Sequence, residues 1–80
     1  MSYSELPELG RAIAYFVFRK KETNYESIRK RFERFDEKLV KIALEEATSQ
    51  ETPFINFDSR RNTYRPSEHL LNTYRILNMV

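Results

Sequence analysis

The sequence contains no cysteine and no tryptophan, a single glycine, and no long apolar run. Without cysteine the chain has neither disulfides nor a thiol nucleophile, which suits an intracellular protein. One glycine excludes glycine-rich phosphate-binding loops. No apolar stretch approaches the roughly 18 residues that span a membrane, and the start, MSYSELPELG, lacks the features of a signal peptide. We therefore expect a cytoplasmic protein, nuclear in a eukaryote, with no membrane association.

The composition that remains is typical of one small folded domain over residues 1–80. Hydrophobic residues make up 40% of the chain and include six Phe and five Tyr, enough for a core. The net charge is only +2, but it is unevenly distributed. Residues 19–38 carry eight Lys and Arg against five Asp and Glu, and residues 54–66 carry three against one. Positive charge is therefore concentrated in two segments of the chain.

No residue pattern indicates catalysis or metal binding. His69 is the only histidine, and a zinc site needs several nitrogen or sulfur ligands. The adjacent carboxylates Glu45 and Glu46 are expected on a helix surface, as ordinary solvated charges. No set of residues has the arrangement of a hydrolytic triad. We therefore expect no enzyme activity, no cofactor and no metal.

Apolar residues at helical spacing predict two helices in the first half of the chain. The first is expected over about residues 4–20, with this core face: Leu6, Leu9, Ala12, Ile13, Phe16 and Val17. The second is expected over about residues 24–34, after a capping box formed by Thr23 and Glu26. Its apolar stripe is Tyr25, Ile28, Phe32 and Phe35.

A third helix, a hairpin and a last helix are expected in the second half. Asp36 is the expected N-cap of a helix reaching about Ser49, with Leu39, Val40, Ala43, Leu44 and Ala47 facing the core. Alternation of Ile55 and Phe57 with polar residues predicts a half-buried strand, DSRRN at 58–62 a turn, and residues 63–65 the return strand. Ser67 is expected to cap a helix with Leu70, Leu71, Tyr74 and Leu77 on one face.

This order of elements resembles the winged-helix (winged helix-turn-helix) superfamily over nearly all 80 residues. The likeness lies in the element order, the tight turn before the third helix and the hairpin. The exit Asn62-Thr63-Tyr64-Arg65-Pro66 is also similar to small winged helices of general transcription factors. The resemblance implies a mostly α fold with a small β-hairpin: a three-helix core, a hairpin wing and a C-terminal helix. It further implies that the third helix enters the major groove of DNA and that the wing lies along the backbone or minor groove.

Basic residues on these elements are the candidate contacts to double-stranded DNA. Arginines at the wing tip and wing base could reach phosphates, as could a basic face of the second helix. The candidates are Lys30, Arg31, Arg34, Lys38, Lys41, Arg60, Arg61 and Arg65. The alternative is an ordinary solvated surface, in which Glu26–Lys30 and Arg29–Glu33 stabilise the second helix as i,i+4 pairs.

The third helix is the least suited of these elements to deep insertion into DNA. Residues 36–51 hold two basic and five acidic side chains, and a carboxylate repels phosphate unless it accepts from cytosine. We therefore expect its N-terminal turn to lead, with Ile42 exposed to a thymine methyl or a protein surface. Two functions stay open: a small DNA-binding transcription regulator, or a winged-helix module that binds protein partners in transcription or replication machinery.

Some apolar side chains lie off the expected core faces. On the first helix these are Tyr15 and Phe18, and on the last helix Ile76, Met79 and Val80. Together they are the candidate interface of a homodimer or of a protein partner, and dimers with two-fold symmetry are the commonest soluble assembly. A frayed terminus, or fuller packing within the domain, would also account for them.

Overall fold

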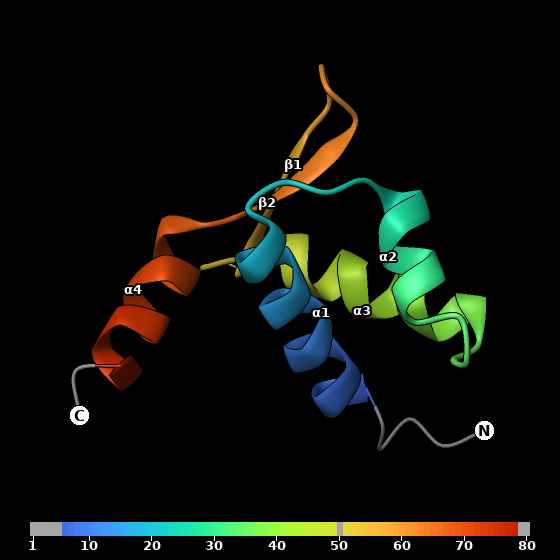
Figure 1. The fold of residues 1–80 in the computed structure, drawn as a ribbon, viewed down its shortest axis with the longest axis horizontal. Helices are drawn as coiled ribbons and strands as arrows, with labels where there is room; N and C mark the ends of the chain where they lie inside the picture. The colour runs from blue at the N-terminus through green and yellow to red at the C-terminus, as the bar shows by residue number, and fades with distance from the viewer. Residues whose placement is uncertain (1–5, 50, 79–80) are drawn as a thin grey trace.

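The computed structural model describes residues 6–49 and 51–78, which form four helices and one antiparallel hairpin. The elements are α1 (Leu6–Lys20), α2 (Tyr25–Arg31), α3 (Glu37–Ser49), β1 (Ile55–Asp58), β2 (Thr63–Pro66) and α4 (Glu68–Asn78). The hairpin projects from the helices, and α2 and α4 lie on opposite sides of it (Figure 1). The mostly α fold with a small hairpin is thus confirmed. None of the described helices has the length and hydropathy needed to span a bilayer.

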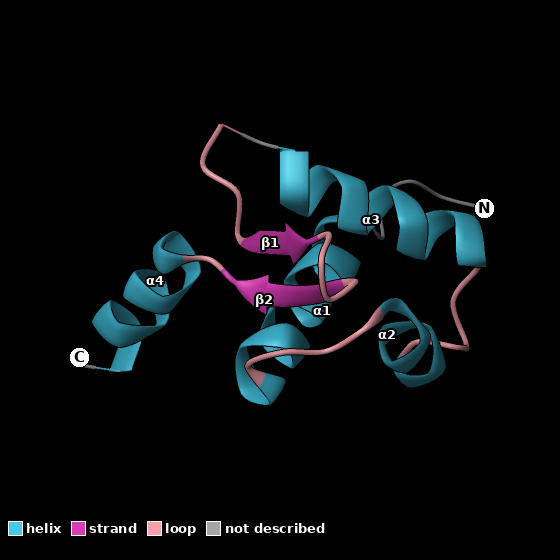
Figure 2. Ribbon diagram, turned by 90° about the horizontal axis from the view of Figure 1, so that it is seen from above, coloured by secondary structure: helices cyan, strands magenta, loops and turns pink. Residues whose placement is uncertain are grey.

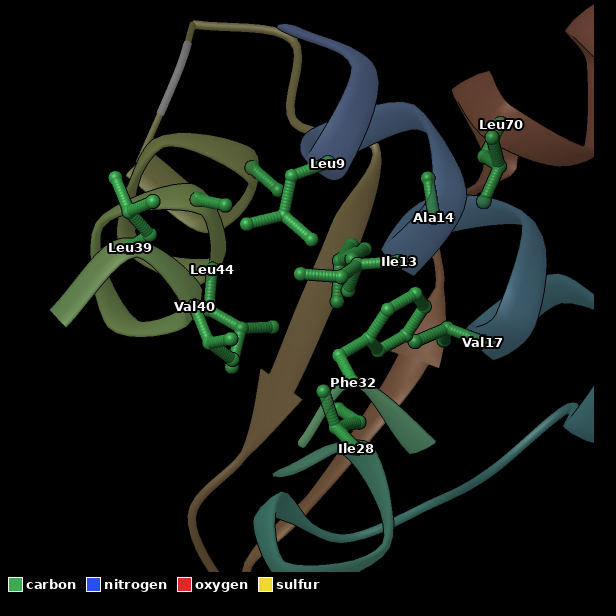
Figure 3. Close-up of a cluster of buried hydrophobic side chains, with 13 residues drawn as sticks. Leu9, Ile13, Ala14, Val17, Ile28, Phe32, Leu39, Val40, Leu44 and Leu70 are labelled. Atoms are coloured by element: carbon green, nitrogen blue, oxygen red, sulfur yellow. The ribbon is translucent and has the colours of Figure 1, made fainter. Parts of the chain in front are cut away.

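The core lies mainly between α1 and α3. Figure 3 shows Leu9 and Ile13 of α1 pointing toward the side chains of α3, while Ile28 of α2 and Phe32, just after that helix, close one end. The buried apolar residues are Leu9, Ile13, Ala14, Val17, Ile28, Phe32, Leu39, Val40, Ala43, Leu44, Ala47, Ile55 and Leu70. Each larger aliphatic side chain in this set contributes about 1.5–3 kcal/mol by leaving water. This shared burial fixes the position of the hairpin, because Ile55 of β1 is part of it.

The predicted core face is confirmed for α3 and only partly for α1. All five residues predicted to face the core from α3 are buried. On α1, Ala12 is exposed, contrary to prediction, whereas Ala14 is buried. The reason is that α1 contacts three elements, α3, β2 and α4. Its buried residues therefore do not form the single stripe expected for a helix that packs against one partner.

The start of α2 differs from prediction by one residue. Asn24, and not Thr23, is the N-cap, and its Oδ1 accepts from the backbone N–H of Ser27 at 2.8 Å. Thr23 instead pairs with Tyr64 of β2, with its N–H donating to the Tyr64 carbonyl at 3.0 Å and its carbonyl accepting in return at 2.6 Å. The segment between α1 and α2 is therefore bonded to the hairpin, and β2 lies between that segment and β1.

α2 is also shorter than predicted, ending at Arg31 and not near Arg34. Arg29 has a structural part in this end, because one of its guanidinium nitrogens donates to the carbonyls of Phe32 and Phe35 at 3.1 and 3.0 Å. These bonds join α2 to its C-cap residue Phe32 and to the segment that leads into α3. The next helix begins as predicted, since Asp36 Oδ1 accepts from the N–H of Lys38 at 2.8 Å.

The hairpin turn follows the chemistry of its sequence. Asp58 Oδ1 accepts from the backbone N–H groups of Arg60 and Arg61 at 3.0 and 3.3 Å. Asn62 adopts φ 56°, a left-handed conformation that asparagine tolerates. Figure 2 shows the hairpin from above, with α3 alongside β1 and the end of α1 alongside β2.

Phe57 does not follow the predicted inward alternation. Ile55 is fully buried, but Phe57, two residues further on, is 46% exposed. The strand has left the helices by this point, and Phe57 packs instead on its cross-strand partner Tyr64, with ring centroids 4.9 Å apart.

α4 begins as predicted after Ser67, whose Oγ accepts from the N–H of Leu70 at 3.1 Å. Leu70 is buried, but Leu71 is 40% exposed, so the predicted face is narrower than expected. The side chain of Leu77 lies outside the described residues.

Candidate nucleic-acid interface

Two of the three hairpin arginines converge on Glu22, in the segment that joins α1 to α2. Arg61 Nη1 lies 3.2 Å from Glu22 Oε2, and Arg65 Nε lies 4.0 Å from the same oxygen. The hydroxyl of Thr63 donates to it at 3.2 Å. Arg60 makes no ion pair with any residue that the structure describes. Of the two arginines predicted at the wing tip, Arg60 is thus solvated and Arg61 is paired with Glu22, which also lies near Arg65 at the wing base.

These ion pairs are accessible to solvent. The side chains of Arg61, Arg65 and Glu22 are 66%, 58% and 35% exposed. Pairs of this kind contribute only about 0–1 kcal/mol to stability, because water and salt screen them. Either arginine can therefore exchange the carboxylate for a phosphate at little cost.

An open groove of ≈ 900 Å³, here called the hairpin groove, lies between the hairpin, the end of α1 and the start of α4. Its cationic side chains are Arg19, Lys21, Arg60 and Arg65. Its apolar side chains include Phe18, Phe57 and Leu71. Asp58 is the single carboxylate among the described residues that line it, and the turn amides already occupy one of its oxygens. The groove therefore combines positive charge with exposed aromatic surface.

A second, shallower groove of ≈ 690 Å³, the α2 groove, lies between the end of α1, α2 and β2. It brings the predicted residues Lys30 and Arg31 together with Lys20 and with Thr63 of the hairpin. Arg34 is exposed beyond the end of α2 and is not among the residues that line this groove.

The predicted residues of α3 lie apart from these two grooves. Lys38 and Lys41 are exposed, and Lys41 Nζ is 3.8 Å from Glu37 Oε1. Glu37 also accepts from the hydroxyl of Tyr25 at 3.3 Å. Burial, and next the charge of Glu37, raise the pKa of Tyr25. Ile42 was predicted to be exposed, but it is half-buried.

The exposed surface of α3 is otherwise electrically mixed. Glu45 and Glu46 are both exposed, one turn after Lys41. The lysines therefore occupy only the N-terminal part of this surface, as the sequence predicted.

The predicted interface residues of α1 have partners within the domain. The ring of Tyr74 on α4 lies 5.8 Å from that of Tyr15 and 4.5 Å from that of Phe18, measured between centroids. Burial, and next the electrostatic interaction with Tyr15, raise the pKa of Tyr74. Ile76, in contrast, is 64% exposed. Met79 and Val80 lie outside the described residues.

Three basic residues at the end of α1, Arg19, Lys20 and Lys21, were not among the sequence candidates. Arg19 and Lys21 line the hairpin groove and Lys20 the α2 groove. Lys21 has φ 68°, the left-handed conformation that commonly ends a helix. The run RKK was a visible signal, but only the packing of α1 against β2 places it beside the hairpin.

The described residues contain no group of three or more side chains suited to hold a metal ion. His69 lies against the ring of Phe54, with centroids 5.0 Å apart.

Comparison with known proteins does not assign the chain to a family. No family model matches it, no curated protein matches it, and no solved structure matches it. A functional argument therefore depends on the geometry described above.

Proposed function

We propose that the chain is a winged-helix protein that binds double-stranded DNA, of the kind that regulates transcription, with the hairpin as its wing. The observation that carries this proposal is the gathering of cations on both sides of the hairpin. Four of them line the hairpin groove and three line the α2 groove. Exposed lysines and arginines bind DNA by neutralising phosphates and releasing counterions.

The topology supports the same proposal. The backbone of Thr23 bonds to β2, so the hairpin is joined to the segment between α1 and α2 and not only to its own flanking loops. The hairpin is thereby held against the end of α1, where the three basic residues lie. Phosphate contacts made by a hairpin held in this way would fix the orientation of the domain on DNA.

The role of α3 follows from its charges. We expect Lys38 and Lys41 to approach phosphates and Glu45 and Glu46 to remain outside the groove. The wing and α2 then supply most of the affinity, and α3 contributes at its N-terminal turn.

The decisive experiment is a titration of a short blunt duplex at two salt concentrations, with the wild type and an Arg60→Ala/Arg61→Ala variant. The variant should lose affinity by similar factors on every sequence. Its salt slope should flatten by roughly one to two units, since each lost phosphate contact removes about 0.9. An Arg11→Ala/Arg75→Ala variant is the matched control, because both arginines are exposed and neither lines either groove. Equal behaviour of the two variants would exclude the wing.

The mixed charge of α3 favours one second candidate, a module that binds a protein partner. In that case wild-type protein would show little affinity for duplex at either salt concentration. Glu45→Lys would then disrupt a protein complex and leave DNA binding absent.

A further inference from the structure

Phe57 occupies an unusual place for a phenylalanine on a short strand. It is 46% exposed, while Ile55 of the same strand is fully buried. Its ring contacts that of Tyr64 at a tilt of 49°, and the residue also lines the hairpin groove. An exposed phenylalanine alone needs no explanation. Phe57 differs from a lone exposed phenylalanine because cationic side chains line the same groove.

Those groups define the ligand that the hairpin groove fits. Four cationic side chains line it, against one carboxylate that already accepts from two turn amides. Its ≈ 900 Å³ is within the range of about 300–1,000 Å³ that is usual for ligand clefts. A ligand matched to this groove is polyanionic and presents flat apolar surface. Nucleic acid with unpaired bases has both properties.

A paired duplex matches the groove less well, because its bases are stacked on one another and show only their edges. An aromatic ring beside a basic track is the arrangement that binds single strands, with the bases on the ring and the phosphates on the cations.

We propose that the hairpin groove binds an unpaired strand of nucleic acid, with one base stacked on Phe57 and the adjoining phosphates held by Arg19, Lys21 and Arg60. This inference deepens the proposed function and rests on it, since Arg60 serves both the duplex and the unpaired strand. The protein would then bind preferentially where duplex meets single strand, such as at an overhang or an opened region.

The test compares three probes: an oligothymidine strand, a blunt duplex, and the same duplex with a single-stranded overhang. Phe57→Leu keeps an apolar side chain and removes the ring. It should weaken binding of the single strand by about 5- to 150-fold, the usual effect of losing one stacking ring. Binding of the blunt duplex should change less than about twofold, because no phosphate contact is lost. Ile76→Ala is the control, since Ile76 is an apolar side chain that is 64% exposed and does not line the groove.

A second variant provides a direct signal. The chain has no tryptophan, so Phe57→Trp places a single tryptophan in the groove, which can be excited selectively over the five tyrosines. Its emission should be quenched by the oligothymidine strand and unchanged by blunt duplex. This readout also serves if Phe57→Leu fails to fold.

Each contrary outcome has a definite meaning. Unchanged single-strand binding by Phe57→Leu, with duplex binding intact, overturns the inference and leaves the proposed function standing. Equal losses on single strand and blunt duplex also overturn it, because Phe57 then belongs to the duplex surface. Equal quenching by free thymidine monophosphate assigns the groove to a small ligand. Failure of wild-type protein to bind any of the three probes overturns the proposed function and the inference together.

Discussion

Replacing Glu22 by glutamine should increase the affinity for DNA, because this carboxylate holds the two arginines that the wing would otherwise offer to phosphates. Glu22 Oε2 lies 3.2 Å from Arg61 and 4.0 Å from Arg65. Glutamine keeps the length of the side chain and an oxygen that can accept from the hydroxyl of Thr63, as Glu22 does at 3.2 Å. Only the negative charge is removed.

The magnitude follows from counterion release. One additional phosphate contact steepens the plot of log affinity against log salt by about 0.9, which corresponds to about fivefold tighter binding at 0.15 M salt relative to 1 M. Release of Arg61 alone should therefore give about fivefold, and release of Arg61 and Arg65 together about thirtyfold. The free energy of unfolding should fall by no more than about 1 kcal/mol, because both arginines are more than half exposed.

The assay is fluorescence anisotropy with a labelled blunt duplex over a series of salt concentrations, combined with thermal unfolding. Glu8→Gln is the control for net charge, since Glu8 is exposed in the first turn of α1. It lies about 18 Å along the helix from Lys20 at 1.5 Å per residue. Equal gains for Glu8→Gln and Glu22→Gln would refute a local role for Glu22. A loss of affinity in Glu22→Gln would show that the carboxylate positions the arginines for binding.

Three further predictions concern the end of α1, the tyrosines and α4. Lys21→Gly should leave thermal stability unchanged or higher, because glycine adopts φ 68° without strain, while nucleic-acid affinity falls about fivefold on titration at 0.15 M salt. Burial raises the pKa of Tyr64 and Tyr74 above 10.0, so the folded state holds these protons more tightly than the unfolded chain does. In urea unfolding, the contribution of these two tyrosines to the free energy of unfolding should therefore be constant below pH 10.0 and should decline as the pH rises through their raised pKa values. Tyr74→Phe should make this decline smaller. If the exposed Ile76 joins two copies, sedimentation at micromolar concentration should give about twice the chain mass for the wild type, and Ile76→Glu should give the monomer; a monomeric wild type would exclude this interface.

Local chemistry was sufficient to predict much of the fold. Asp36 and Ser67 cap their helices as predicted, because an N-cap depends on backbone amides only two or three residues away. Asp58 organises the hairpin turn for the same reason. The core face of α3 was also correct, since helical spacing selects it and the core of the domain covers it.

What required the tertiary structure is the pairing of residues far apart in the sequence. Glu22 and Arg61 are 39 positions apart, and no local rule joins them. The sequence predicted Thr23 as a helix cap, yet its backbone pairs with Tyr64, 41 positions further on, and the neighbouring Asn24 caps α2. The alternation of β1 predicted that Phe57 would be buried, but the helices cover only the start of the strand. The sequence alone thus determined which residues carry positive charge, and the packing of α1 against β2 decided that Arg19 and Lys21 share a groove with an exposed phenylalanine.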